Sequence, residues 1–412
     1  MHYSLVQGYT YLAMKYIVLI MDGASGWPLP IRSGRTCLEL AHKPNLDSLA
    51  RQGVLGLART VPEGMEPSSA CACLSILGYN PRLYYSGRGA IEARSLGLSL
   101  KDSEVAFRCN LVAVRDGKML SYSSGQISDQ ESHPLMAALQ QALGSETIRF
   151  CPGVGYRHIC VLKDHPDTIQ ALCTPPHDIT GKPVAGFLPQ GTGSQLLREL
   201  MSRSEKVLRE HPVNTARSAR GDIPATMIWL FWGSKRAPDL PAFQEVYGLK
   251  AGLSSAVDLL RGLAQLASID ILDIPGVTAG LDNDYAAQAE GALKALRQHD
   301  MAILHIEAPD EAAHTGSIED KVKAIEQIDR EVIGRFLSRR ELRLLVMPDH
   351  STPIEIQTHV PDPVPFLLWG PGFASNGATA FSEAEAQKKL FIEQGHTLMS
   401  KLVSGRATGV VY

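Results

Sequence analysis

The stretch Val346-Met347-Pro348-Asp349-His350-Ser351-Thr352 decides how the rest of the chain is interpreted. The apolar residues 342–346 lie between a charged run and a proline, a pattern typical of a buried strand. A carboxylate and an imidazole at the end of a strand are ligands that a divalent ion of the Zn or Mn type accepts. Taken alone, Asp349 and His350 fit a turn cap and a surface histidine at least as well. The choice therefore depends on what the other strands carry.

Composition limits the class of protein. The chain has 412 residues, which is more than one hydrophobic core usually holds, so two domains are expected. Hydrophobic residues make up 44% and charged residues 20%, as in ordinary globular proteins. A net charge of -3 argues against a nucleic-acid partner and against an anionic membrane surface. Seven cysteines without a Cys-x-x-Cys pair indicate reduced thiols, and hence a cytoplasmic location.

The first residues resemble a signal peptide only superficially. No Lys or Arg precedes Lys15, and no small-residue cleavage site follows the apolar run. The run 16–21 is too short to cross a bilayer, so we expect it to be the first buried strand. Met14 is a natural start, and residues 1–13 are therefore expected to be an extension without a role in the fold.

Two further predicted strands end in metal-ligand residues. The strand 15–21 is followed by Asp22, for which an Asp-Gly turn is the alternative explanation. The strand 301–306 is followed by Asp310 and His314, which are four residues apart and share one side of a helix. His359 lies on the loop after Asp349-His350. Because the carboxyl ends of parallel strands share one edge of a sheet, these side chains are expected to converge.

The converging residues sort into two metal sites. One would hold Asp310, His314 and His359. The other would hold Asp22, Asp349 and His350, with Ser69 as a further ligand. Two divalent ions at such sites activate a nucleophile and stabilise the oxygens of an in-line displacement.

Ser69 and Arg88 are the candidate reactive residues. Ser68-Ser69 precedes a predicted helix of small residues, where a serine is usually a cap. The same position suits a nucleophile, because the helix N-terminus attracts a phosphate. Arg88 stands between two glycines and is free to bind an anion, although an ordinary surface arginine is an equal alternative.

The chain is expected to divide into three segments. Residues 1–81 and 241–412 have the alternating strand and helix pattern of one α/β domain, including a strand at 268–274 and a helix at 282–298. Residues 82–240 mix strands with Pro/Gly turns and basic residues, and we expect an inserted second domain. The loops of this domain carry residues suited to a polar substrate. Loops without a role in binding could have the same composition.

The motifs identify a family. The chain resembles the archaeal-type 2,3-bisphosphoglycerate-independent phosphoglycerate mutases of the alkaline phosphatase superfamily over nearly its whole length. The shared motifs are I-V-L-I-M-D-G, P-N-L-D-S-L-A, L-S-I-L-G-Y-N-P, Y-Y-S-G-R-G-A-I-E-A, P-P-H-D-I-T-G-K, H-P-V-N, Y-G-L-K with S-A-V-D-L-L-R-G, E-A-P-D-E-A-A-H, and P-D-H-S-T-P with H-V-P-D-P-V-P. The resemblance implies an α/β core with a mainly parallel sheet flanked by helices, and an inserted smaller α+β domain.

The resemblance also implies chemistry. It implies that Ser69 becomes phosphorylated, that the two ligand sets above bind two divalent ions (Mn, Zn, Co or Mg), and that Arg88 holds the phosphoryl group or the substrate. Weaker candidates for substrate contacts are Arg108, His177, Asp178, Asn214 and Arg217.

The implied reaction interconverts 3-phosphoglycerate and 2-phosphoglycerate. The phosphoryl group passes to Ser69, the glycerate reorients, and the phosphoryl group returns to the other hydroxyl. The inserted domain is expected to exclude water during that step, since water would hydrolyse the phosphoserine. The partner is thus a small phosphorylated substrate; the oligomeric state is not readable.

The chain departs from the family pattern around the nucleophile. The family usually has Gly before this serine and an acidic residue after it, whereas this chain has Ser68 and Ala70. Ser68 is therefore a second candidate, and the distance to L-G-Y favours Ser69. The alternative function is a related metal-dependent phosphotransferase or phosphatase with another substrate, for example one that phosphorylates homoserine.

Overall fold

The computed structural model describes residues 14–85, 87–236, 239–339 and 341–407. The chain forms two compact units, each with its own sheet and hydrophobic core. The first combines the stretch that ends at Tyr84 with the stretch that begins at Leu240, and the second is Tyr85–Asp239. The expected extension at 1–13 lies outside the described residues.

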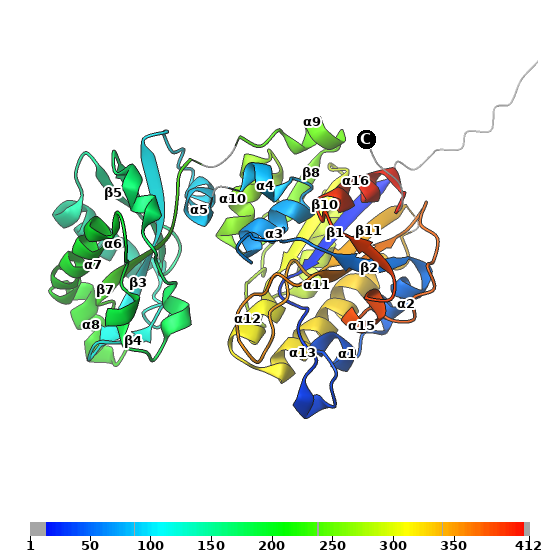
Figure 1. The fold of residues 1–412 in the computed structure, drawn as a ribbon, viewed down its shortest axis with the longest axis horizontal. Coiled ribbons are helices and arrows are strands. Elements are labelled where there is room, and N and C mark those ends of the chain that lie inside the picture. Colours follow the sequence, from blue (N-terminus) through cyan, green and yellow to red (C-terminus); the bar gives the residue numbers. More distant parts are fainter. Residues whose placement is uncertain (1–13, 86, 237–238, 340, 408–412) are drawn as a thin grey trace, which may run out of the picture. The chain divides into compact units, whose positions relative to one another are not determined.

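A twisted sheet of eight strands forms the centre of the first unit (Figure 1). Its strands lie in the order β13-β2-β12-β11-β1-β10-β8-β9. Their bounds are β1 Lys15–Met21, β2 Val54–Ala58, β8 Ala251–Ser254, β9 Asp270–Ile271, β10 Met301–Ile306, β11 Leu342–Met347, β12 Val364–Trp369 and β13 Leu390–Ile392. Strand β12 is antiparallel to β11 and β2, and the other neighbouring pairs are parallel. The fold is therefore mixed α/β with a mainly parallel sheet.

Strand β1 is buried on all sides. Strands β10 and β11 pair with its two edges, and helices cover its two faces. Ile17, Leu19 and Met21 enter the main core on one face, as the alternation of side chains along a strand requires. Val18 and Ile20 are equally buried on the opposite face. A run of β-branched and apolar residues is what such a central strand needs.

Helices pack on both faces of this sheet (Figure 1). Helices α11 and α13 contribute to the core that contains Ile17, and α3 and α16 lie on the other side. The helices of this unit are α1 Cys37–Leu40, α2 Pro44–Gln52, α3 Ser69–Ile76, α4 Pro81–Tyr84, α9 Phe243–Tyr247, α10 Asp258–Leu266, α11 Tyr285–Ala295, α12 Ala308–His314, α13 Ile318–Gln327, α14 Gly334–Phe336, α15 Glu383–Ala386 and α16 Thr397–Ser404, with a 3-10 turn at Pro30–Arg32 and a π-helical turn at Ile328–Ile333.

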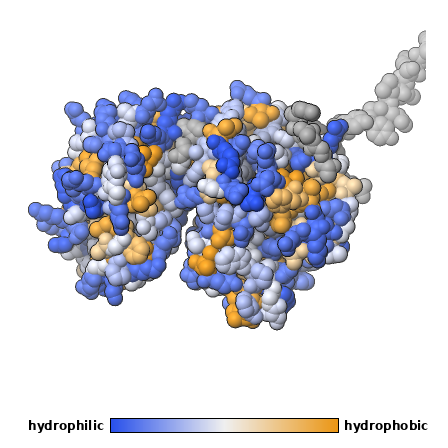
Figure 2. Space-filling view, viewed as in Figure 1, coloured by the Kyte–Doolittle hydropathy of each residue, from blue (hydrophilic) through white to orange (hydrophobic). Residues whose placement is uncertain are grey.

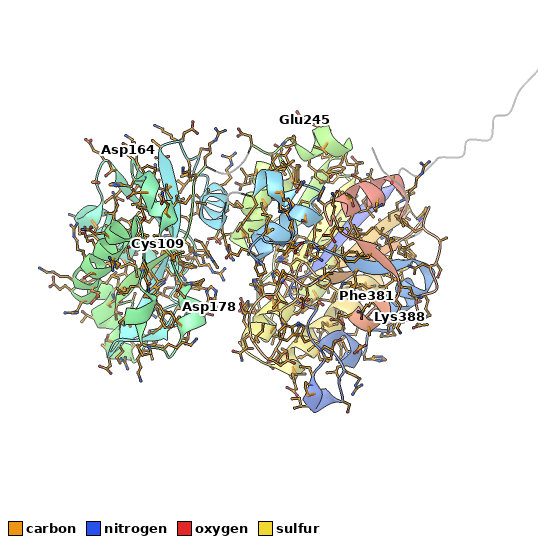
Figure 3. All side chains as sticks on the ribbon, in the orientation of Figure 1. Cys109, Asp164, Asp178, Glu245, Phe381 and Lys388 are labelled. Carbon is orange, nitrogen blue, oxygen red and sulfur yellow. The ribbon has the colours of Figure 1, made fainter. Side chains whose placement is uncertain are left out.

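The second unit is built on an antiparallel sheet of five strands. Strand β3 (Glu104–Arg115) pairs with β4 (Lys118–Ser121), β6 (Arg157–Lys163) and β7 (Met227–Ser234), and β5 (Ile148–Cys151) pairs with β6. Its helices are α5 Arg88–Ser95, α6 Asp129–Leu143, α7 Ser194–Arg209 and α8 Pro212–Arg220, with 3-10 turns at Pro166–Gln170, Pro176–Ile179 and Val184–Phe187. Figure 3 shows Cys109 inside this unit and Phe381 in the first; both are fully buried.

Two elements are shorter than the sequence pattern predicts. The expected strand 268–274 is reduced to β9, because it lies at the sheet edge and pairs with β8 over two residues. The expected helix 282–298 begins only at Tyr285, because the Asp284 side chain accepts the backbone N–H of Ala287 and caps the helix there.

The surface is predominantly polar. Figure 2 shows that hydrophilic residues cover most of the visible face and that apolar residues lie in smaller patches. None of the described helices combines the length and apolar character that crossing a bilayer requires. All seven cysteines carry free thiols, and six of them are buried.

Candidate metal centre and active site

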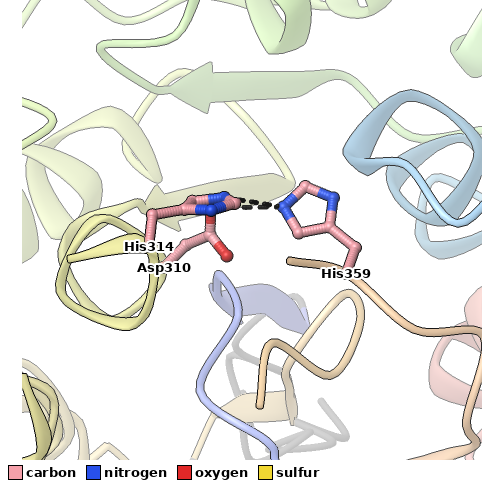
Figure 4. Close-up of side chains that lie close together, drawn as sticks. All are labelled: Asp310, His314 and His359. Carbon is pink, nitrogen blue, oxygen red and sulfur yellow. Dashed lines mark hydrogen bonds and ion pairs between the residues drawn. The ribbon is translucent and has the colours of Figure 1, made fainter. Parts of the chain in front are cut away.

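Asp310, His314 and His359 form the first group of candidate ligands (Figure 4). Asp310 Oδ2 lies 3.1 Å from His314 Nε2 and 3.5 Å from His359 Nε2, and the two imidazole nitrogens are 3.0 Å apart. Helix α12 places Asp310 and His314 one turn apart on the same side. His314 Nδ1 lies 2.8 Å from the carbonyl oxygen of Gln357, to which it can only donate. This bond holds the ring with Nε2 facing the group.

Asp22, Asp349 and His350 form the second group, in the interior of the first unit. His350 Nε2 lies 3.1 Å from Asp349 Oδ2 and 3.5 Å from Asp22 Oδ1. Asp349 Oδ1 accepts the backbone N–H groups of Gly23 and His350 at 3.1 and 2.8 Å, which fixes the carboxylate plane. Asp22 and Asp349 follow the adjacent parallel strands β1 and β11, so the sheet itself brings them together.

Thr352 connects the two groups. Its hydroxyl donates to Asp310 Oδ1 at 2.6 Å, and its oxygen lies 3.2 Å from His350 Nδ1. Because that hydroxyl proton is used on Asp310, Thr352 accepts the Nδ1–H of His350, which leaves Nε2 as the ligand atom. The His350 and His359 rings are stacked with centroids 3.8 Å apart.

Ser69 opens helix α3 beside the second group. Its hydroxyl lies 3.1 Å from His350 Nε2, and the residue is 7% exposed. Ser68 is the N-cap of the same helix, where its hydroxyl accepts the backbone N–H of Cys71 at 3.4 Å. The geometry thus separates the two serines: Ser68 caps the helix, and Ser69 faces the imidazole.

The buried histidines and carboxylates perturb each other's pKa values. Burial alone would raise the pKa of Asp310, but His314 and His359 hold it well below its ordinary range. Burial opposes protonation of His314, yet the Asp310 carboxylate raises the pKa of His314 to about 10. Burial lowers the pKa of His350 to about 4, so its imidazole is neutral near pH 7.

Asp22 is buried close to two other carboxylates. Burial raises its pKa well above the ordinary value, and the nearby carboxylates of Asp349 and Glu307 raise it further. Its Oδ1 is buried and, within the part of the chain that the structure describes, accepts no hydrogen bond. Such a group is costly without a compensating cation. Together with the carboxylate and imidazole donors of both groups, this unpaired oxygen fits divalent metal ions.

Sequence reasoning missed the residues that surround these groups. His305 Nε2 lies 2.8 Å from Asp22 Oδ2, and Glu307 lies two residues further on. Both were detectable as polar residues next to an otherwise apolar run: His305 lies in β10, and Glu307 directly follows the last residue of that strand. Lys321 is fully buried and donates from Nζ to the carbonyl oxygens of Ser25 and Thr352. Its signal is a lysine on the apolar face of its helix.

The second unit brings Arg88, Arg108 and His177 together. Glu92 lies between the two arginines: Arg88 Nε is 2.5 Å from Glu92 Oε1, and Arg108 Nη1 pairs with Glu92 Oε2. The Arg88 guanidinium lies 4.0 Å from the centre of the Trp232 ring, and the His177 ring centre is 5.5 Å from that ring. Trp232 has φ +50°, a strained backbone conformation for a residue with a side chain.

The other three expected substrate contacts lie differently. Asp178, which is labelled in Figure 3, is exposed. Its Oδ1 lies 3.7 Å from His177 Nε2. Asn214 is buried and bonds the backbone through both ends of its amide, so it holds the chain between α7 and β7. Arg217 is buried, pairs with Glu131 and donates to the Ser124 carbonyl oxygen. These bonds show that Asn214 and Arg217 support the backbone of the second unit, and their expected substrate contacts stay predictions.

Proteins from several organisms are similar to this chain in sequence and in fold. The family described as 2,3-bisphosphoglycerate-independent phosphoglycerate mutase matches residues 50–214. A protein of that name from Methanothrix thermoacetophila is 48% identical over 95% of this chain and 100% of its own length. The protein named 2,3-bisphosphoglycerate-independent phosphoglycerate mutase 2 from Methanothermobacter thermautotrophicus is 44% identical over 96% and 99%.

Solved structures agree at the level of the fold. A protein of Pyrococcus horikoshii has a TM-score of 0.77 at 28% identity and is matched over 97% of this chain and 100% of its own. A cofactor-independent phosphoglycerate mutase of Thermoplasma acidophilum has a TM-score of 0.59 at 24% identity, over 95% and 99%. The two sequence matches span almost the whole length of this chain and of each relative. The chain belongs to the 2,3-bisphosphoglycerate-independent phosphoglycerate mutase family.

Proposed function

We propose that this protein interconverts 3-phosphoglycerate and 2-phosphoglycerate and that Ser69 carries the phosphoryl group between the two hydroxyls. The observation that carries the proposal is the position of Ser69 Oγ, 3.1 Å from His350 Nε2 and next to two groups of candidate metal ligands. Family membership supports the same activity, since relatives of 42–48% identity are named for it. A small phosphorylated substrate and a cytoplasmic location belong to this proposal.

The ligand groups would hold two divalent ions of the Mn, Zn, Co or Mg type. Asp310, His314 and His359 would bind one, and Asp22, Asp349 and His350 with Ser69 the other. Bound there, the ions would favour loss of the serine proton and offset the charge of the phosphoryl group. His314 donates from Nδ1 to the Gln357 carbonyl oxygen, and His350 donates from Nδ1 to the Thr352 hydroxyl oxygen; these bonds keep the imidazoles oriented for this task.

The phosphoryl group is transferred in two steps, and each step breaks one bond to phosphorus and forms another. Ser69 Oγ forms a bond to phosphorus as the bond from phosphorus to the 3-oxygen of glycerate breaks, and the serine proton ends on that oxygen. The 2-hydroxyl then attacks the phosphoserine, and its proton returns to Ser69. The positive end of the α3 dipole at Ser69 favours the phosphoryl group in both steps.

We propose that the polar residues of the second unit contribute the substrate contacts. Arg88 and Arg108 are the candidates for the phosphoryl or carboxylate oxygens, because a guanidinium binds such groups bidentately. Glu92 and Trp232 support this role, since they orient the Arg88 guanidinium from two sides. His177 and Asp178 are the candidates for the glycerate hydroxyls.

The test is a coupled assay on the full chain loaded with Mn(II). With 3-phosphoglycerate as substrate and enolase as the coupling enzyme, turnover is expected for the unchanged protein and for Ser68→Ala, and none for Ser69→Ala. Mass spectrometry should locate phosphate on Ser69 after quenching. Turnover by Ser69→Ala would contradict the proposal. Release of phosphate from p-nitrophenyl phosphate without mutase turnover would instead favour a related phosphatase with another substrate.

A further inference from the structure

A cavity of about 250 Å³ lies between the segment that precedes helix α11 and helix α13. The two helices pack on the same face of the eight-stranded sheet (Figure 1). The lining of the cavity includes the apolar residues Leu281 and Ala324 and the polar residues Asp282, Tyr285, Lys323 and Gln327. None of the residues that line it is a candidate metal ligand or substrate contact, so the cavity is separate from the site described above.

The Tyr285 hydroxyl is a buried donor without an acceptor. Tyr285 is 6% exposed, and its hydroxyl oxygen has no hydrogen-bond partner in the described part of the chain. Burial raises the pKa of Tyr285 to about 12, and the negative charge of Asp282 acts in the same direction, so the hydroxyl keeps its proton near neutral pH. A buried hydroxyl that donates to nothing costs free energy. A ligand oxygen in the cavity would remove this cost.

Lys323 and Asp282 bring opposite charges to the same cavity. Asp282 Oδ1 accepts the Thr278 hydroxyl at 2.7 Å, which leaves Oδ2 available. Among the described residues, Lys323 and Asp282 form no ion pair with each other or with a third side chain. The cavity therefore offers a cation and an anion that can both bind a ligand.

Gln327 adds a further donor. Its Oε1 accepts a hydrogen bond from Arg330 Nη2 at 2.7 Å, so its amide nitrogen remains for a ligand. The donors of Tyr285, Lys323 and Gln327 suit a carboxylate, and the Asp282 carboxylate suits an ammonium group. The volume lies below the roughly 300–1,000 Å³ of sites for drug-sized ligands, so a molecule of few atoms fits. These features together match a small zwitterion.

We propose that this cavity binds a free α-amino acid with a small side chain. The carboxylate of the ligand would accept hydrogen bonds from Tyr285 and Lys323, and its ammonium group would donate to Asp282. A short side chain would pack against Leu281 and Ala324. The inference goes beyond the proposed mutase activity and does not depend on it, because it involves neither the metal ligands nor Ser69.

The test is isothermal titration calorimetry on the full chain, with glycine, L-alanine and L-serine as probes. We expect saturable binding with one equivalent per chain. Tyr285→Phe should weaken it roughly 10- to 100-fold, because a buried hydrogen bond to a charged group is lost. Lys323→Met should weaken it only about 2- to 5-fold, because that charge is exposed. Acetate and methylammonium, which each carry one of the two charges, should bind more weakly than any of the three amino acids.

Two controls separate loss of binding from loss of the fold. Lys294→Met changes an exposed lysine of α11 that does not line the cavity, and it should leave the affinity unchanged. Tyr285→Phe removes a hydroxyl that has no partner among the described residues, so without ligand its melting temperature should equal or exceed that of the unchanged protein.

Three outcomes would overturn the proposal. The first is the absence of saturable binding of all three amino acids up to about 10 mM, a weak affinity for a specific site. The second is equal affinity in Tyr285→Phe and in the unchanged protein. The third is acetate binding as tight as that of the amino acids, which would exclude the zwitterion. Loss of mutase turnover would not touch the proposal, since the titration uses neither metal nor phosphoglycerate.

Discussion

Lys321 should hold together the loops that carry the two groups of candidate metal ligands. Its Nζ donates to the Ser25 carbonyl oxygen at 2.9 Å and to the Thr352 carbonyl oxygen at 2.8 Å, and the side chain has no solvent exposure. Ser25 follows Asp22 and Thr352 follows His350, so one ammonium group connects the segments after β1 and β11. Lys321→Met keeps an unbranched side chain that is one heavy atom shorter, and it removes the ammonium group and both bonds.

The cost can be worked from these contacts. A hydrogen bond from a charged donor contributes roughly 1.5–3 kcal/mol, so losing two costs about 3–6 kcal/mol. The variant no longer buries an ammonium group, whose desolvation lowers the pKa of Lys321, and this returns part of the loss. We expect a net destabilisation of about 3 kcal/mol.

Hydrogen exchange measures this change in the first unit alone. The amides of β1 and β11 should exchange about 150-fold faster in Lys321→Met, since 1.4 kcal/mol corresponds to a factor of ten. Lys323→Met is the matched control: this lysine is exposed on the same helix, and its change should stay within roughly 0.5 kcal/mol. Equal exchange rates in Lys321→Met and the control would refute the reasoning.

Three further predictions concern the bonds within each unit. Thr352→Val removes the hydroxyl that donates to Asp310, so Mn(II) affinity measured by calorimetry should fall by roughly 10- to 100-fold, and an unchanged affinity would contradict the orienting role. Arg108 and Arg88 outweigh the effect of burial and lower the pKa of Glu92 to about 2. The ionised carboxylate therefore contributes about 3 kcal/mol to the free energy of unfolding above pH 4.5, and this contribution is lost as pH falls toward 2. Acid unfolding of Glu92→Gln should lack this pH-dependent part. His314 has a pKa of about 10 without metal, so Mn(II) binding at pH 8 should release a proton from it, detectable by calorimetry in buffers of different ionisation enthalpy; no release would contradict the Asp310 pairing.

The convergence of the candidate metal ligands could be predicted from sequence because the rule behind it is simple. Asp22, Asp310 and Asp349 each follow an apolar strand, and parallel strands present their carboxyl ends together. The same rule does not predict which side chains surround the candidate ligands. His305 and Lys321 are identified by burial and hydrogen bonds, which depend on how helices and strands pack and not on spacing along the chain.

Two of the expected substrate contacts show what residue composition alone leaves undecided. Asn214 and Arg217 are polar residues of helix α8, and polarity alone does not distinguish a ligand contact from a bond to the backbone. In the structure both are buried and engaged. Arg88 lies on a helix start beside Trp232, which the sequence places far away and only the β3–β7 pairing and α5 bring close.

Anomalous X-ray scattering at the manganese edge, from crystals of the full chain soaked in Mn(II), tests the central claim most directly. Side chains from opposite ends of the sequence should form one cation-binding centre beside Ser69. The account predicts one peak within about 2–2.5 Å of the Asp310, His314 and His359 ligand atoms and another within the same distance of those of Asp22, Asp349 and His350. Absence of a peak from either group in crystals saturated with Mn(II) would contradict it.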